Sequence, residues 1–152
     1  MPDHDTQRKR PLDALAGSWE LEATLDGRSM SVARTTFAWH GGLLLGHAEP
    51  PTSIVPEWQG LAPETTDTAL GLDDHTGAFS MLYADARGVS RIYAMTLDGH
   101  RWTLRSRPGP DFHQRFEGAF AAAGDRIDGR WERSEDGETW ALDFDVTYRR
   151  TG

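Results

Sequence analysis

Residues 129–150 read GRWERSEDGETWALDFDVTYRR, a stretch typical of a β-hairpin. Side chains alternate between the two faces of a strand. In the second arm one face is therefore apolar, whereas Asp143, Asp145 and Thr147 belong to the polar face. The segment Ser134-Glu135-Asp136-Gly137 between the arms is typical of a hairpin turn. The apolar face needs a cover, and we expect the rest of the chain to provide it. The residues expected on that face are Trp140, Leu142, Phe144, Val146 and Tyr148.

The preceding chain repeats this pattern of short strands and turns. About ten short segments of β-type composition are separated by turn signals at intervals of about eight to twelve residues. Asp26-Gly27, Gly41-Gly42 and Asp98-Gly99 are examples of these turns. No segment keeps a helical period. The pattern predicts an all-β, antiparallel barrel of about ten strands in a single domain over residues 12–150, with a short helical turn over residues 11–16 and a flexible arm over residues 1–11.

Composition excludes several classes of partner. The 152 residues carry a net charge of −8 and no cysteine. Nucleic acids and anionic membrane surfaces require basic patches, so we expect neither as a partner. No apolar run approaches the roughly 20 residues of a membrane span. We expect a cytoplasmic protein without disulfides, metal or cofactor, and a homodimer is compatible with these totals.

One segment, residues 50–63, departs from the regular pattern. It reads PPTSIVPEWQGLAP, and its prolines are incompatible with a central strand. Irregular segments of this length commonly carry function. Its apolar residues favour docking onto the barrel, so we predict a lid that places Trp58 over the interior.

The interior is expected to be aromatic with a few polar groups. Trp102, Phe116 and Trp131 either pack the core or line an apolar pocket. Arg91 shares its parity with Tyr93, which predicts a guanidinium inside the barrel that needs a carboxylate from the protein or from a ligand. The alternative is an arginine that reaches the rim. Tyr83 and Tyr93 would supply phenol donors.

Two further residues are candidates for proton transfer. His47 and Glu49 share their parity with Leu43 and Leu45, which predicts that they face the interior. His47 would act as a base or as an axial ligand, although a single histidine is more often structural. His40 lies beside a turn. The histidines lack the spacing of a zinc site. Acidic residues on the polar hairpin face are expected to point outward and to pair with Arg130 or Arg133. They are Asp128, Glu132, Asp143 and Asp145.

Two motifs resemble known families. Gly17-Ser18-Trp19, after a short helical turn, resembles the Gly-x-Trp opening of lipocalins and other calycins. The second half resembles the uncharacterised bacterial DUF1579-like family, which implies a lipocalin-like barrel and no defined activity. The stretches that carry this resemblance are RGVSRIY at 87–93, Trp102, PDFHQRFEG at 110–118, GRWERS at 129–134, Asp136-Gly137 and WALDFD at 140–145.

Three functions remain open from the sequence. The first is the binding of a small, largely hydrophobic molecule, for which Arg91 favours an anionic group. The residues expected to contact it are Trp58, Tyr83, Arg91, Tyr93, Trp102, Phe116 and Trp131. The second is a cyclase or isomerase that uses the same pocket, with His47 or Glu49 as the acid or base. The third is a haem- or nitric-oxide-binding barrel with His47 or His40 as the axial ligand.

Overall fold

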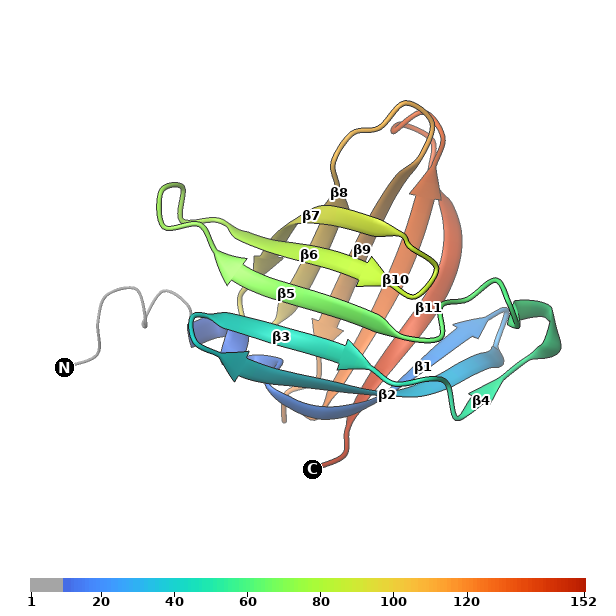
Figure 1. The fold of residues 1–152 in the computed structure, drawn as a ribbon, viewed down its shortest axis with the longest axis horizontal. Helices are drawn as coiled ribbons and strands as arrows, with labels where there is room; N and C mark the ends of the chain where they lie inside the picture. Colours follow the sequence, from blue (N-terminus) through green and yellow to red (C-terminus); the bar gives the residue numbers. More distant parts are fainter. Residues whose placement is uncertain (1–9) are drawn as a thin grey trace.

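The computed structural model describes residues 10–152, and most of this range forms a barrel (Figure 1). All neighbouring strands are antiparallel, and pairing between the first two strands closes the ring. The predicted all-β barrel of about ten strands is thus confirmed. In the order of the chain, the barrel strands are β1 (Gly17–Leu25), β2 (Arg28–His40), β3 (Leu43–Ala48), β5 (Thr66–Leu72), β6 (Phe79–Asp85), β7 (Ser90–Leu97), β8 (Arg101–Ser106), β9 (His113–Phe120), β10 (Arg126–Ser134) and β11 (Ala141–Arg150).

A short 3-10 helix, η1 (Arg10–Ala14), closes one end of the barrel. Leu12, Leu15 and Trp19 are all 0% exposed there. The indole nitrogen of Trp19 donates a hydrogen bond of 2.8 Å to the Leu15 carbonyl. The predicted helical turn is therefore present, and it starts one residue earlier than expected. Of the predicted flexible arm, residues 1–9 lie outside the described residues.

The guanidinium of Arg150, at the C-terminal end of β11, also stabilises this closed end. It stacks 4.1 Å from the centre of the Trp19 ring. It also donates hydrogen bonds of 2.7 Å to the Ala16 carbonyl, 3.0 Å to the Ala14 carbonyl and 3.4 Å to the Gly124 carbonyl. Two of these acceptors, the carbonyls of Ala14 and Ala16, lie at the end of η1, where carbonyl groups have no helical partner.

Residues 50–63 fold over the other end of the barrel. They contain the two-residue strand β4 (Ser53–Ile54), which pairs with β2, and the 3-10 helix η2 (Pro56–Trp58). Glu57 forms an ion pair of 2.8 Å with Arg28, and the Leu61 carbonyl accepts a hydrogen bond of 3.0 Å from Arg87. Trp58 packs edge-on against Phe144, with ring centres 5.7 Å apart. The segment is therefore an ordered cover, held by the pairing of β4 with β2 and by three contacts that involve side chains.

A bulge interrupts the hairpin of β10 and β11. Trp131 pairs with Phe144, but the next residue, Glu132, pairs with Leu142. Asp143 is thus the extra residue and has no cross-strand partner, so the strict alternation of faces ends there. Leu142, expected on the apolar face, is 37% exposed as a result.

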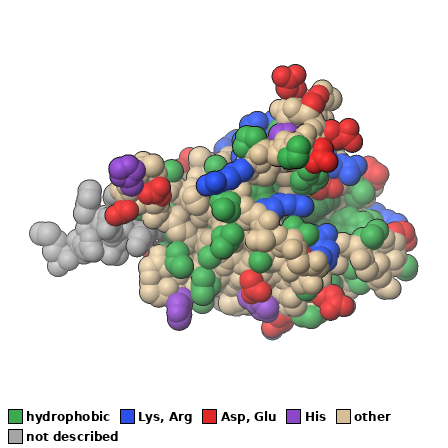
Figure 2. All heavy atoms as spheres, turned by 45° about the horizontal axis from the view of Figure 1, so that its top comes forward, with side chains coloured by type: hydrophobic (Ala, Val, Ile, Leu, Met, Phe, Trp, Pro, Cys, Tyr) green, Lys and Arg blue, Asp and Glu red, His purple; other side chains and the backbone are tan. Residues whose placement is uncertain are grey.

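The outer face of the barrel carries a row of apolar side chains. Leu45, Ala69, Leu82 and Ile92 are successive cross-strand partners on β3, β5, β6 and β7. Leu45, Leu82 and Ile92 are 39%, 49% and 43% exposed. Hydrophobic side chains are visible down this face of the molecule in Figure 2. Nothing among the described residues covers this row.

No helix within residues 10–152 has both the length and the apolar character needed to cross a membrane.

Candidate functional site

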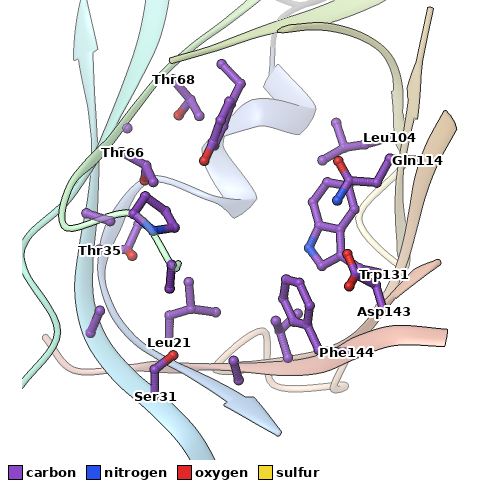
Figure 3. Close-up of a pocket in the computed structure, with 18 of the residues that line it drawn as sticks. Leu21, Ser31, Thr35, Thr66, Thr68, Leu104, Gln114, Trp131, Asp143 and Phe144 are labelled. Carbon is purple, nitrogen blue, oxygen red and sulfur yellow. The ribbon is translucent and has the colours of Figure 1, made fainter. Parts of the chain in front are cut away.

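The barrel contains a cavity of about 770 Å³ between two unlike walls. The wall formed by β1, β2, β3 and β5 presents mostly small side chains, whereas the opposite wall presents large aromatic ones. Figure 3 shows Thr35, Thr66 and Thr68 facing Leu104 and Trp131 across the open centre. The cavity exists because the small wall does not fill the space that the aromatic wall leaves. Small residues lining it include Ala23, Ala33, Thr35, Ala48, Thr66 and Thr68, and aromatic ones include Tyr83, Tyr93, Trp102, Trp131, Phe144 and Tyr148.

The cavity reaches the surface at the end covered by residues 50–63. Leu61 and Phe112 line it and are 69% and 39% exposed. Trp58, which belongs to this cover, also lines the cavity and is half-buried. A volume of this order suits a drug-sized molecule, since ligand pockets commonly measure about 300–1,000 Å³.

Gln114 is the centre of a polar cluster on the aromatic wall. The phenol of Tyr93 donates a hydrogen bond of 2.7 Å to Gln114 Oε1, and Arg91 donates a longer one of 3.4 Å to the same atom. The backbone N–H of Gln114 donates to Ser106 Oγ at 2.9 Å. Gln114 itself is only 9% exposed. The cluster therefore fixes one amide of the wall firmly in place.

Arg91 lines the cavity without a carboxylate partner. Its guanidinium lies 4.8 Å from the centre of the Phe112 ring and touches Gln114. Among the described residues, no acidic group lies within ion-pair distance of it. The predicted inward position of Arg91 is thus consistent with the structure, and the protein does not supply the matching anion in residues 10–152.

A second polar group lies beside this cluster. Asp85 has a side chain that is 0% exposed, and it accepts hydrogen bonds of 2.6 Å from Arg87 and 2.8 Å from Tyr83. Burial alone would raise the pKa of Asp85, but these hydrogen bonds outweigh it and lower the pKa to about 2. Burial and the bond to Asp85 raise the pKa of Tyr83, and burial raises that of Tyr93. Both phenols are therefore neutral donors at pH 7.

The predicted orientation of β3 is wrong. Leu43 and Leu45 are exposed, whereas Leu44 is 0% exposed and Gly46 and Ala48 face the cavity. His47 consequently points outward, and its Nδ1 lies 2.7 Å from Asp67 Oδ1 on the neighbouring strand. A strand with three consecutive leucines has no clear apolar face, which is why alternation misassigned it.

His47 and Glu49 reach the cavity only at its edge. Both are among the lining residues and both are exposed. His40 is exposed and does not line the cavity. Within residues 10–152, no histidine ring is thus held in the interior beside the aromatic wall. The catalytic role predicted for His47 and Glu49 stays a prediction.

Phe116 differs from the other predicted contact residues because it does not line the cavity. Its ring lies flat over two glycines, so that a Cβ added to Gly129 would come within 2.3 Å of it and one added to Gly118 within 2.8 Å. Phe116 therefore belongs to the wall itself, packed against Trp102 and Trp131. Trp102 is 2% exposed and forms the deeper part of the lining.

Gln114 and Asp143 are two of the lining residues that the sequence analysis did not assign to the interior. Gln114 shares the parity of Phe116 and Phe120, so alternation alone would have found it. Asp143 was expected to point outward with Asp145, but the bulge turns it toward the cavity beside Trp131 (Figure 3). No signal in the sequence marks that bulge. The rest of the acidic group does point outward and pairs with arginines, although only Asp145 pairs with one of the two expected partners. These pairs are Asp128 with Arg126, Glu132 with Arg115, and Asp145 with Arg130, each at 3.0 Å.

Comparisons with known proteins support the fold. No family model matches the chain, so the resemblance to the DUF1579-like family stays a prediction. No curated protein matches it either. The crystal structure of Rv2717c from M. tuberculosis is similar, with a TM-score of 0.57 over 95% of this chain and 98% of that chain, at 12% sequence identity. At this identity the similarity shows a shared β-barrel fold and no shared activity. The cytoplasmic location and the homodimer stay predictions.

Proposed function

We propose that this protein binds a small, largely apolar molecule inside its barrel. The observation that carries the proposal is the cavity of about 770 Å³, which has aromatic side chains on one wall and a short polar cluster near its mouth. Predominantly apolar walls with a few fixed polar groups are the usual design of small-molecule sites. The binding residues in this proposal are Trp58, Tyr83, Arg91, Tyr93, Trp102 and Trp131.

A large internal cavity lowers the stability of a folded protein and is not needed for folding alone. Side chains in interiors are normally packed with few voids larger than a water molecule. Filling the space would have required only larger residues on the small wall, for example at Ala33, Ala48 or Thr68, which all line the cavity. Retention of an open interior in a barrel of this size supports the storage, transport or conversion of a ligand.

A cavity-filling variant tests the proposal. Ala33→Phe places a ring in the cavity, whereas Ala119→Phe adds the same ring to the exposed outer face of β9. The uncharged dye 1-aminoanthracene fluoresces more strongly in apolar surroundings and serves as the probe. We expect the wild type and Ala119→Phe to bind the dye equally, and Ala33→Phe to bind it at least about tenfold more weakly, because its ring takes the place of the dye.

Equal binding by Ala33→Phe and the wild type would show that the dye does not enter the barrel. Mass spectrometry of the protein under non-denaturing conditions, directly after purification, would identify any molecule that stays bound. A co-purified molecule that is recovered chemically altered would indicate that the protein is an enzyme and does more than bind its ligand.

A further inference from the structure

We propose that Gln114, Trp131 and Arg91 form a subsite for the carboxylate of a monoanionic ligand, the rest of which is apolar. This inference rests on the proposed function and names the chemical class of the ligand. The three residues come from neighbouring parts of the aromatic wall, on β9, β10 and β7, and all three line the cavity. Each of them offers hydrogen-bond donors that no described residue accepts.

The neighbours of Gln114 determine which way its side-chain amide is oriented. Arg91 can only donate, so the amide atom that it contacts must be the oxygen. Tyr93 donates to that same oxygen at 2.7 Å. The amide nitrogen of Gln114 is therefore on the other side, and no described residue accepts its two N–H groups. Figure 3 shows this amide facing the open centre of the cavity.

The indole of Trp131 supplies a second donor next to the first. Trp131 pairs with Phe116 and Arg133 pairs with Gln114, so Gln114 and Trp131 are diagonal neighbours on the inner face of the sheet. The Trp131 ring packs on that of Tyr93, with centres 5.8 Å apart. Its nitrogen points into the cavity in Figure 3, and no described residue accepts a hydrogen bond from it.

The charge of Arg91 indicates which chemical group of a ligand would accept these hydrogen bonds. Its half-buried guanidinium has an aromatic ring and an amide oxygen as neighbours, but no carboxylate among the described residues. The neighbouring Arg87 differs, because Asp85 neutralises it at 2.6 Å. Partly buried arginines usually have an anionic partner, and a planar carboxylate matches the fork of the guanidinium. An anionic ligand would complete this environment.

The acidic lining residues restrict the charge of the ligand. Asp143 lies beside Trp131 in Figure 3, and Glu49 and Glu64 line the cavity near its exposed edge. A dianionic phosphate at the subsite would double the attraction to Arg91 and also double the repulsion by Asp143, so its second charge would gain little that offsets the cost of removing it from water. The subsite thus favours a carboxylate, with its apolar remainder directed toward the wall of small residues.

Matched ligands test the inference by isothermal titration calorimetry at pH 7. The probes are 2-naphthoic acid and decanoic acid, each beside its methyl ester, and 2-naphthyl phosphate. We expect the wild type to bind each acid at least about tenfold more tightly than its ester, because the ester lacks the charge that Arg91 requires. We expect the naphthyl phosphate to bind more weakly than the naphthoic acid.

Two variants then test which residues cause the preference for acids over esters. Arg91→Met should lower the affinity for both acids at least about tenfold and leave the esters unchanged. Gln114→Glu should do the same, because its carboxylate occupies Arg91, and this variant should unfold at the same temperature as the wild type or at a higher one. Arg34→Met removes an exposed arginine outside the cavity lining and serves as the control, with wild-type affinities.

The outcomes separate this inference from the proposed function. Equal affinity for acid and ester in the wild type overturns the carboxylate subsite and leaves a binding barrel. A preference for the acids that survives in both variants also overturns it. If none of the five probes binds and the dye also fails to bind, both the inference and the proposed function are contradicted.

Discussion

The two ends of the barrel use the same residue types in opposite ways. At the closed end, Trp19 donates to one backbone carbonyl and Arg150 donates to three, so both side chains are bonded to the backbone around them. At the open end, Trp131 and Arg91 line the cavity, and the described residues give the indole no acceptor and the guanidinium no anion. The tryptophan and the arginine at the closed end thus have structural hydrogen bonds, whereas those at the open end keep donors that the described residues do not accept.

The largest contrast concerns the two tryptophans. Trp19→Ala should destabilise the protein by about 3–5 kcal/mol, the usual cost of removing a buried aromatic side chain. Trp131→Ala should cost less than this, because one side of its ring already faces the cavity and makes fewer packing contacts. Urea unfolding followed by circular dichroism measures both free energies. Equal losses would mean that the two ends do not differ in packing.

The two arginines should also differ in their contributions to the free energy of unfolding. Arg150→Met removes hydrogen bonds from a charged donor to three carbonyls, and we expect a loss of about 2–3 kcal/mol. Arg91→Met removes a charge without an anionic partner, so we expect a change within about 0.5 kcal/mol. The same unfolding experiment compares them. A loss at Arg91 as large as that at Arg150 would show that Arg91 is a structural residue.

Asp85 extends the comparison of the two ends, because this carboxylate lies at the open end but receives its hydrogen bonds from the protein. Its pKa is lowered from 3.8 to about 2 in the folded protein. The stability it contributes is therefore nearly complete above about pH 4 and is lost as the pH falls toward 2, with a magnitude of about 2 kcal/mol. The difference in unfolding free energy between wild type and Asp85→Asn should shrink from pH 6 to pH 3. A difference independent of pH would contradict this assignment.

The smallest expected effect concerns the ordered cover. Arg28→Met removes an exposed ion pair with Glu57 that links residues 50–63 to the barrel. Exposed pairs contribute little, so we expect a loss of stability below about 1 kcal/mol. Proteolysis within residues 50–63 should nevertheless become faster, because one of the contacts that hold the segment is gone. Unchanged cleavage rates would show that the pairing of β4 with β2, Trp58 and the Leu61 contact suffice to hold the cover.

Sequence patterns predict the architecture better than the cavity. Alternation and turn signals correctly predict the barrel, because these rules act locally along each strand. They fail at β3, where Gly46 and Ala48 face inward although neither resembles a core residue. They fail again at Asp143, because a bulge depends on how two strands pair and not on either strand alone. Both errors fall on the cavity, since the features that keep it open are small residues and an irregular pairing.

Hydrogen exchange of the indole N–H groups tests the contrast between the two ends most directly. Nuclear magnetic resonance resolves these protons, and Trp→Phe variants assign them. In the ligand-free protein, we predict slow exchange for Trp19, which is buried and bonded to Leu15, and fast exchange for Trp131, which faces the cavity. Saturating 2-naphthoic acid should slow the exchange of Trp131 and leave that of Trp19 unchanged. Equally slow exchange of both protons without ligand would contradict an open, unsatisfied site in the barrel.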